Sequence, residues 1–222
     1  MNGDEQENVA EGLQAENPGD ISEPEVIGPD SPEPAIQPEG VHCYIGAPGV
    51  GKTHTAIRHA LTLARSKGQG VLVVDTRAAE NLAVIPEHHS IPQVIQTVWG
   101  YRGIARIIPR RNKTKSDAFE QLMGAVDHYG ACCVVIDEVA TWARNITLIE
   151  LCRVWRHRKV SLFLTTQKVG GDMEQGVLAC DPWIHLFRCS NPMSIEWAEE
   201  WGGIDPAELS ALEPGQYFLI HF

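Results

Sequence analysis

Long hydrophobic runs are absent from this chain of 222 residues. No stretch reaches the roughly 18 apolar residues that a membrane-spanning helix needs. The N-terminus is acidic and contains no apolar segment, which argues against an ordinary secretion signal. We therefore expect a cytoplasmic protein without a membrane span.

Cysteine pairs with the spacing of metal or redox motifs are also absent, which excludes the usual forms of both. None of the six cysteines forms a C-x-x-C pair, and at least four lie in apolar runs typical of strands. The nine histidines show no ligand spacing either. We expect reduced cysteines in the core of a cytosolic protein. The six are Cys43, Cys132, Cys133, Cys152, Cys180 and Cys189.

Basic and aromatic residues are missing from the first 40 positions. This segment has 11 acidic residues, no Lys or Arg, and six of the 14 prolines. Such a composition cannot bury enough apolar surface to fold, so we predict a disordered acidic tail over 1–40. The net charge of −11 lies entirely in this tail, because residues 41–222 carry 18 basic and 18 acidic side chains. The tail is interpreted as a solubilising linker, with binding to a basic partner or mimicry of DNA as alternatives.

The remaining segment, 41–222, has the length of one domain. Short apolar runs alternate in it with helical patterns, which predicts an α/β fold with a mostly parallel central sheet flanked by helices. The last two runs are expected to add strands at one edge. The runs are 41–45, 70–75, 103–109, 131–138, 160–167, 183–189 and 216–222.

The stretch GAPGVGKT fits the G-x-x-x-x-G-K-[ST] phosphate-loop pattern between an apolar run and a helical pattern that stops at Gly68. Its glycines let backbone N–H groups turn toward phosphate oxygens. Lys52 is expected to reach the β- and γ-phosphates of ATP, and Thr53 to bind Mg²⁺. The predicted nucleotide-binding residues are Gly46, Ala47, Pro48, Gly49, Val50, Gly51, Lys52, Thr53 and His54.

The run ACCVVIDE ends in two adjacent carboxylates. In a Walker B strand, Asp137 would position Mg²⁺ and Glu138 would polarise the attacking water. The next run ends in Thr-Thr-Gln, and Gln167 can contact the γ-phosphate and report its loss. We therefore predict a RecA/ASCE-like P-loop NTPase with Glu138, Gln167 and Lys52 in catalytic roles.

The succession GAPGVGKT, VVIDE, RVWRHRKVSLFLTTQ and LFRCSNPMSIEWAEEWGG resembles the FtsK–HerA superfamily of DNA-pumping ATPases. Within that superfamily, its small size makes this chain most similar to the genome-packaging ATPases of membrane-containing, double-jelly-roll viruses and phages. The resemblance covers most of 41–222 and implies a homo-oligomeric ring that uses ATP and Mg²⁺ to move double-stranded DNA. It also implies a location in the host cytoplasm or on the virion, with capsid or portal-vertex proteins as partners.

Two sets of basic residues are candidates for further roles in such a ring. Ring ATPases commonly place a neighbour's Arg on the γ-phosphate, and we favour Arg156 or Arg158 over Arg144 and Arg153. Helix-end charges that complement the helix dipole are the alternative interpretation. A dense basic run could line a ring pore and contact DNA phosphates, or it could be a solvated connector. Its predicted DNA contacts are Arg106, Arg110, Arg111, Lys113 and Lys115.

The sequence thus predicts an ATP-driven double-stranded DNA translocase that packages a viral genome. Two other functions remain open at this stage. One is a non-motor NTP-dependent switch or helicase loader, against which the strand-end Gln167 and the short C-terminus argue. The other is a small-molecule kinase, against which the adjacent Asp137 and Glu138 argue.

Overall fold

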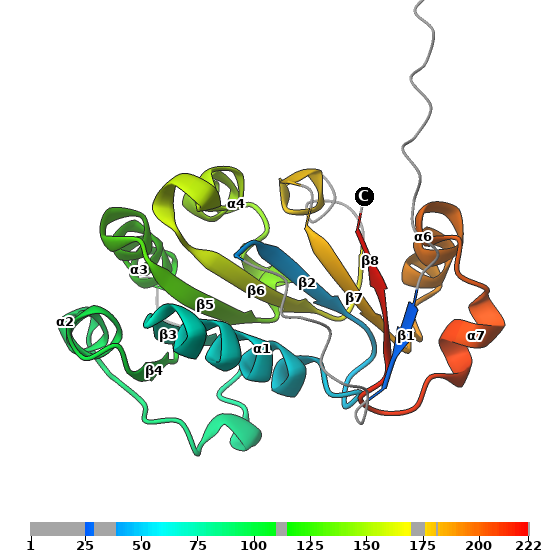
Figure 1. Cartoon of the computed structure of the whole chain (residues 1–222), viewed down its shortest axis with the longest axis horizontal. Coiled ribbons are helices and arrows are strands. Elements are labelled where there is room, and N and C mark those ends of the chain that lie inside the picture. The colour runs from blue at the N-terminus through cyan, green and yellow to red at the C-terminus, as the bar shows by residue number, and fades with distance from the viewer. Residues whose placement is uncertain (1–24, 29–38, 110–114, 170–175, 181, 222) are drawn as a thin grey trace, which may run out of the picture.

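The computed structural model describes residues 25–28, 39–109, 115–169, 176–180 and 182–221 (Figure 1). Within these ranges eight strands form one sheet in the order β1-β8-β7-β2-β6-β5-β3-β4. Strands β7, β2, β6, β5, β3 and β4 are mutually parallel, whereas β8 runs antiparallel to both β7 and β1. The strands are β1 (Glu25–Ile27), β2 (Val41–Ile45), β3 (Gly70–Asp75), β4 (Ile104–Ile107), β5 (Cys132–Asp137), β6 (Ser161–Thr166), β7 (Trp183–Phe187) and β8 (Tyr217–Ile220). The predicted fold class is confirmed, and the last two runs do lie toward one edge.

Helices cover both faces of the sheet (Figure 1). They are α1 (Lys52–Lys67), α2 (Ile91–Ile95) with the π-helical turn η2 (Gln96–Gly100), α3 (Lys115–Tyr129), α4 (Ile146–Arg158), α6 (Pro192–Gly202) and α7 (Pro206–Ala211). Short 3₁₀ turns are η1 (Glu80–Leu82), η3 (Val139–Trp142) and η4 (Leu178–Cys180). The predicted stop of the first helix is confirmed, because Gly68 adopts the left-handed conformation that ends α1. None of the described helices has the length and apolarity needed to cross a membrane.

The core lies in two layers because alternate residues of each strand face opposite sides of the sheet. On β5, Cys133 and Val135 pack in the layer that contains α1. Their neighbours Val134 and Ile136 pack in the layer that contains α3 and α4. All four side chains are fully buried, which explains why β5 reads as a continuous apolar run rather than an alternating one.

One strand lies inside the segment predicted as a disordered tail. Residues 25–27 form β1, which pairs with β8, so the predicted boundary at residue 40 is wrong for this stretch. Val26 and Ile27 are two adjacent β-branched residues, and Ile27 is buried against the sheet. The rest of the predicted tail, 1–24 and 29–38, lies outside the described residues.

The six cysteines are all free thiols, and five of them are buried. Burial raises the pKa of Cys133 to about 12 and that of Cys189 to about 11. A thiol with so high a pKa is neither a nucleophile nor a ready metal ligand at neutral pH. The prediction that the cysteines lie in the core is correct for five of the six.

Candidate nucleotide-binding site

The carboxyl ends of three neighbouring strands bring the predicted site together. Strand β6 lies between β2 and β5, and all three are parallel. The segment 46–51 therefore follows β2 at the same edge where β5 ends at Asp137 and β6 ends at Thr166. Ligands of open α/β sheets bind at this edge.

The phosphate loop depends on glycine at two positions in particular. A Cβ on Gly46 would lie 2.7 Å from the Cβ of Phe187, so only glycine fits beside β7. Gly51 has a φ of 101° at the N-cap of α1, a backbone conformation that side chains disfavour. The loop is anchored from both sides: the amide of Ala47 donates to Arg188 O at 2.8 Å, and the amide of Gly215 donates to Val50 O at 3.0 Å.

Lys52 lies along the inner side of this loop. Its Nζ donates to Ala47 O at 2.7 Å, and the side chain is almost buried. Burial lowers the pKa of Lys52, and the charges of Glu138 and Asp137 act in the opposite direction. An ammonium group held between the loop carbonyl and two carboxylates is placed where the phosphates of a nucleotide would lie.

Thr53 and Asp137 place two oxygen atoms of the kind that bind Mg²⁺ next to each other. Thr53 Oγ1 donates to Asp137 Oδ1 at 2.8 Å, and Thr165 Oγ1 donates to the same oxygen at 3.0 Å. Mg²⁺ prefers oxygen ligands, keeps several waters and commonly bridges to substrate phosphates. The two residues therefore fit the metal role predicted for them, beside the loop that would hold the phosphates.

Glu138 follows the strand in a left-handed conformation, with a φ of 55°. This conformation is unfavourable for a residue with a side chain and persists where the surroundings fix it. Here the amide of Glu138 donates to Thr165 Oγ1 at 3.0 Å. The two adjacent acids have different partners and can therefore have separate tasks: Asp137 accepts from the hydroxyls of Thr53 and Thr165, whereas Glu138 accepts from the hydroxyl of Thr166.

Gln167 lies one residue beyond β6, beside Glu138. The main-chain N–H of Gln167 donates to Glu138 Oε1 at 3.4 Å, and Thr166 Oγ1 donates to the same oxygen at 3.4 Å. The side chain of Gln167 is half-buried. The structure thus brings the predicted sensor and the predicted catalytic acid together.

Sequence reasoning missed an arginine at this edge. Arg77 Nη2 donates to Glu138 Oε2 at 2.8 Å from the turn that follows β3. The triplet Asp-Thr-Arg at 75–77 is visible in the sequence after an apolar run. Only the strand order, with β3 beside β5, shows that it faces the predicted catalytic acid.

The structure places the two favoured arginine-finger candidates at the opposite edge of the sheet from their own chain's phosphate loop. They lie in the last turn of α4, and the carbonyl of Arg158 accepts from the amide of Ala131 just before β5 begins. Arg158 pairs with Asp127, and Arg156 lies over the ring of Trp155. Both arginines lie next to the Gln-bearing strand in the chain, but at its amino end, because α4 returns the chain to the start of β6.

Of the five predicted DNA contacts, the structure describes Arg106 and Lys115. Arg106 is 6% exposed and pairs with the fully buried Asp75 at 2.7 Å, which corrects its assignment as a DNA contact. Arg106 belongs to strand β4 and not to a loop, and its side chain is buried. Arg110, Arg111 and Lys113 lie outside the described residues, and Lys115 is the first residue of α3.

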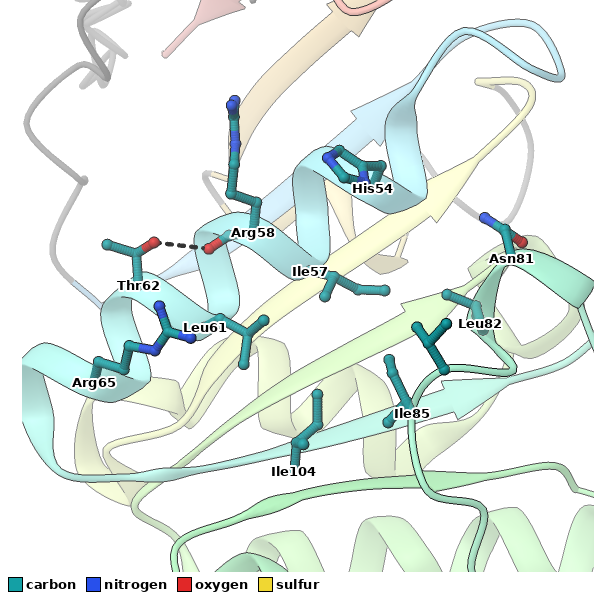
Figure 2. A pocket seen from close by; sticks show the side chains of 11 residues that line it. His54, Ile57, Arg58, Leu61, Thr62, Arg65, Asn81, Leu82, Ile85 and Ile104 are labelled. Atoms are coloured by element: carbon teal, nitrogen blue, oxygen red, sulfur yellow. Dashed lines mark hydrogen bonds between the residues drawn. The ribbon is translucent and has the colours of Figure 1, made fainter.

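A separate groove of about 440 Å³ runs along α1, away from the phosphate loop (Figure 2). Figure 2 shows Ile57 and Leu61 of α1 across from Leu82 and Ile85 of the segment after β3. Its lining is mainly apolar, so it does not suit phosphates. Of the predicted nucleotide-binding residues, only His54, in the first turn of α1, lines the groove.

The parallel sheet, the phosphate loop and the two acids at the end of β5 define the class of this chain as a P-loop NTPase. No protein family description matches the sequence, and no curated protein matches it. Solved structures do match the fold.

The genome packaging NTPase B204 of Sulfolobus turreted icosahedral virus 2, in complex with ATP-gammaS, superposes with a TM-score of 0.64 at 17% identity. That match covers 83% of this chain and 92% of B204. The DNA-packaging ATPase B204 of Sulfolobus turreted icosahedral virus gives 0.60 at 16% identity, over 83% of this chain and 98% of that one.

The cytoplasmic domain of the Thermomonospora curvata type VII secretion ATPase EccC gives 0.51 at 15% identity, over 84% of this chain and 25% of that one. At these identities the likeness is one of fold. The expected resemblance to genome-packaging ATPases is confirmed at that level.

Proposed function

We propose that this chain is an ATPase that moves double-stranded DNA as a homo-oligomeric ring and packages a viral genome. The observation that carries the enzymatic part is the cluster at the carboxyl edge, where Thr53 donates to Asp137 at 2.8 Å beside Lys52 and Glu138. The phosphate loop and this cluster supply what phosphoryl transfer to water requires: positioning, charge stabilisation and a base.

The residues divide the work by position. Loop amides and Lys52 would hold the β- and γ-phosphates of ATP, and Thr53 with Asp137 would hold Mg²⁺, which neutralises charge on the leaving phosphates. Glu138 would orient the attacking water and accept its proton. Gln167 would sense the γ-phosphate with its side-chain amide, and its main-chain N–H lies 3.4 Å from Glu138 Oε1.

The DNA-moving part is supported by the fold and by the basic residues that the sequence carries over 110–115. Strand β4 is parallel to β3 and ends at Ile107, at the same edge of the sheet as the predicted nucleotide-binding residues. The positive charges that follow this strand in the sequence would contact DNA phosphates. The packaging role comes from the shared fold with B204, which is itself described as a genome packaging NTPase.

In the ring, an arginine of a neighbouring subunit would complete the hydrolytic site. Arg156 and Arg158 remain candidates for that role because they lie on the side of the subunit away from its own loop. Docking on a capsid or portal vertex would couple the ring to the virion.

Steady-state ATP hydrolysis with and without long duplex DNA tests the proposal, with Glu138→Gln as the inactive reference. We expect duplex DNA to stimulate the wild-type rate, and Glu138→Gln to bind ATP but turn over at least about 10²-fold more slowly. Replacing Arg110, Arg111, Lys113 and Lys115 by Ala should lower the ratio of the rates with and without DNA. Equal rates with and without DNA, at concentrations where the protein is oligomeric, would contradict a free-standing motor.

A further inference from the structure

The contact between Arg77 and Glu138 is the best-defined interaction of the predicted catalytic acid. Arg77 Nη2 lies 2.8 Å from Glu138 Oε2, whereas the two donors on Oε1 lie at 3.4 Å. The Glu138 side chain is 13% exposed and that of Arg77 is 51% exposed. A charge-assisted bond to a nearly buried carboxylate fixes the carboxylate's orientation more firmly than the two longer bonds do.

The turn that carries Arg77 is itself held by a buried carboxylate. Asp75 Oδ1 accepts from the amide of Arg77 at 3.1 Å, and Asp75 Oδ2 accepts from the amide of Ala79 at 3.0 Å. Between them Ala78 has a φ of 56°, which a residue with a side chain adopts only under constraint. Asp75 thus shapes a turn that would not form from local preference alone.

Arg106 fixes Asp75 in turn. Its Nε and Nη2 donate to Asp75 Oδ2 at 3.0 and 2.7 Å. An uncompensated carboxylate in the interior would be costly, and a two-donor guanidinium both neutralises it and sets its rotamer. A second tie joins the same turn to the Walker B strand, because Thr76 Oγ1 donates to Asp137 O at 2.7 Å.

We propose that Arg77 is a positioning residue for Glu138, and that the buried pair of Asp75 and Arg106 sets Arg77. The chain of contacts runs from β4 through the end of β3 to the acid at the end of β5. This inference rests on the proposed function, since it requires Glu138 to orient the attacking water. It also gives Arg106 a role in hydrolysis instead of the DNA contact predicted from sequence.

The first test is Arg77→Met, which removes the charge of an exposed side chain and should fold normally. We expect kcat for ATP hydrolysis to fall about 10-fold, because a displaced acid no longer aligns the water. The Kd for ATP, measured by titration with a fluorescent ATP analogue, should change by less than about 2-fold. Arg77→Lys keeps the charge and should recover part of the loss. Arg65→Met, an exposed arginine at the end of α1, is the matched control and should match wild type.

The second test asks whether Asp75 and Arg106 act through Arg77. The double variant Asp75→Ala/Arg106→Met removes both buried charges together, so neither is left unpaired in the interior. We expect it to lower kcat, and we expect Arg77→Met to lower kcat by less than about 2-fold further in this background. Circular dichroism and thermal unfolding establish that the variants are folded. A full additional loss from Arg77→Met would show that the buried pair acts on stability alone.

Several results would overturn the proposal for Arg77. An unchanged kcat would show that Glu138 needs no help from Arg77, and a higher kcat would show that Arg77 restrains the acid. A raised Kd for ATP with an unchanged kcat would make Arg77 a nucleotide contact. Glu138→Gln separates these failures from failure of the proposed function: if it hydrolyses ATP normally, the role of Glu138 itself is wrong.

Discussion

The two edges of the central sheet carry similar charged side chains in very different settings. At the amino edge, Arg158 pairs with Asp127 while both side chains are about half exposed, at 46% and 39%. At the carboxyl edge, Arg106 pairs with Asp75 at 6% and 0% exposure, and Arg77 reaches the nearly buried Glu138. Water screens the pair of Arg158 and Asp127, whereas Arg106 and Asp75 interact in a low-dielectric setting.

The contribution of an ion pair to the stability of this protein therefore depends on how deeply its two side chains are buried. The amino-edge pair is independent and contributes little to stability. The two carboxyl-edge pairs are joined through the turn after β3, because Asp75 also accepts from the amide of Arg77. The variants below each change an ionisable residue of one region, in order of decreasing expected effect.

Arg106→Met should have the largest effect on stability. It leaves the carboxylate of Asp75 buried without a partner, and breaking a buried pair in this way costs about 3–5 kcal/mol. Urea unfolding followed by circular dichroism measures the loss. A loss below about 1 kcal/mol would mean that Asp75 is accessible to water and that the two edges do not differ as described.

Lys52→Ala should weaken nucleotide binding. The ammonium lies in the loop beside two carboxylates, and a hydrogen bond to a charged group contributes about 1.5–3 kcal/mol, so the Kd for ATP should rise roughly 10- to 100-fold. Titration with a fluorescent ATP analogue measures it. Lys67→Ala lies on the same helix at the other edge and serves as the control; an equal effect of both variants would refute the placement of the phosphates.

Acid should destabilise the protein through histidines that lie between the edges, beneath α1. Burial lowers the pKa of His42 to about 3 and that of His59 to about 4, and it also lowers the pKa of His185, which His42 contacts. The cluster also faces Tyr44 and Tyr217. The unfolded chain therefore binds more protons than the folded one below the usual pKa of 6.5, so stability falls as the pH drops from about 6.5 toward 4.

Each buried histidine adds about 1.4 kcal/mol per pH unit to that slope. Urea unfolding at pH values from 7.5 to about 4.5 measures the slope. His42→Gln should reduce it by one group's share, and the exposed His157→Asn should leave it unchanged. A slope that is the same in all three proteins would show that His42 titrates normally in the folded state.

Arg158→Met should have the smallest effect. Exposed pairs contribute about 0–1 kcal/mol, and the partner Asp127 remains solvated after the change. The same urea experiment measures the loss in the free energy of unfolding, which can be compared directly with the loss in Arg106→Met. A loss above about 2 kcal/mol would show that the amino-edge pair supports the junction at Gly130 and Ala131.

The sequence predicted this fold well because its signals are local. Apolar runs give the strands of a buried parallel sheet, and the loop pattern with Gly68 gives the first helix. The short strand β1 was missed because two apolar residues in an acidic, proline-rich segment carry too weak a local signal. They form a strand because β8 offers an open edge, which is a property of the tertiary structure.

The sequence alone was enough to predict the nucleotide-binding residues, because the loop pattern with Lys52 and Thr53 follows one apolar run and Asp137 and Glu138 end another. Only the tertiary structure decided what the arginines do. Arg106 and Arg158 look alike in the sequence, but one lies inside the sheet against Asp75 and the other lies at the far end of α4. Strand order and the return direction of crossover helices bring distant residues together, and neither is encoded in the residues adjacent to an arginine.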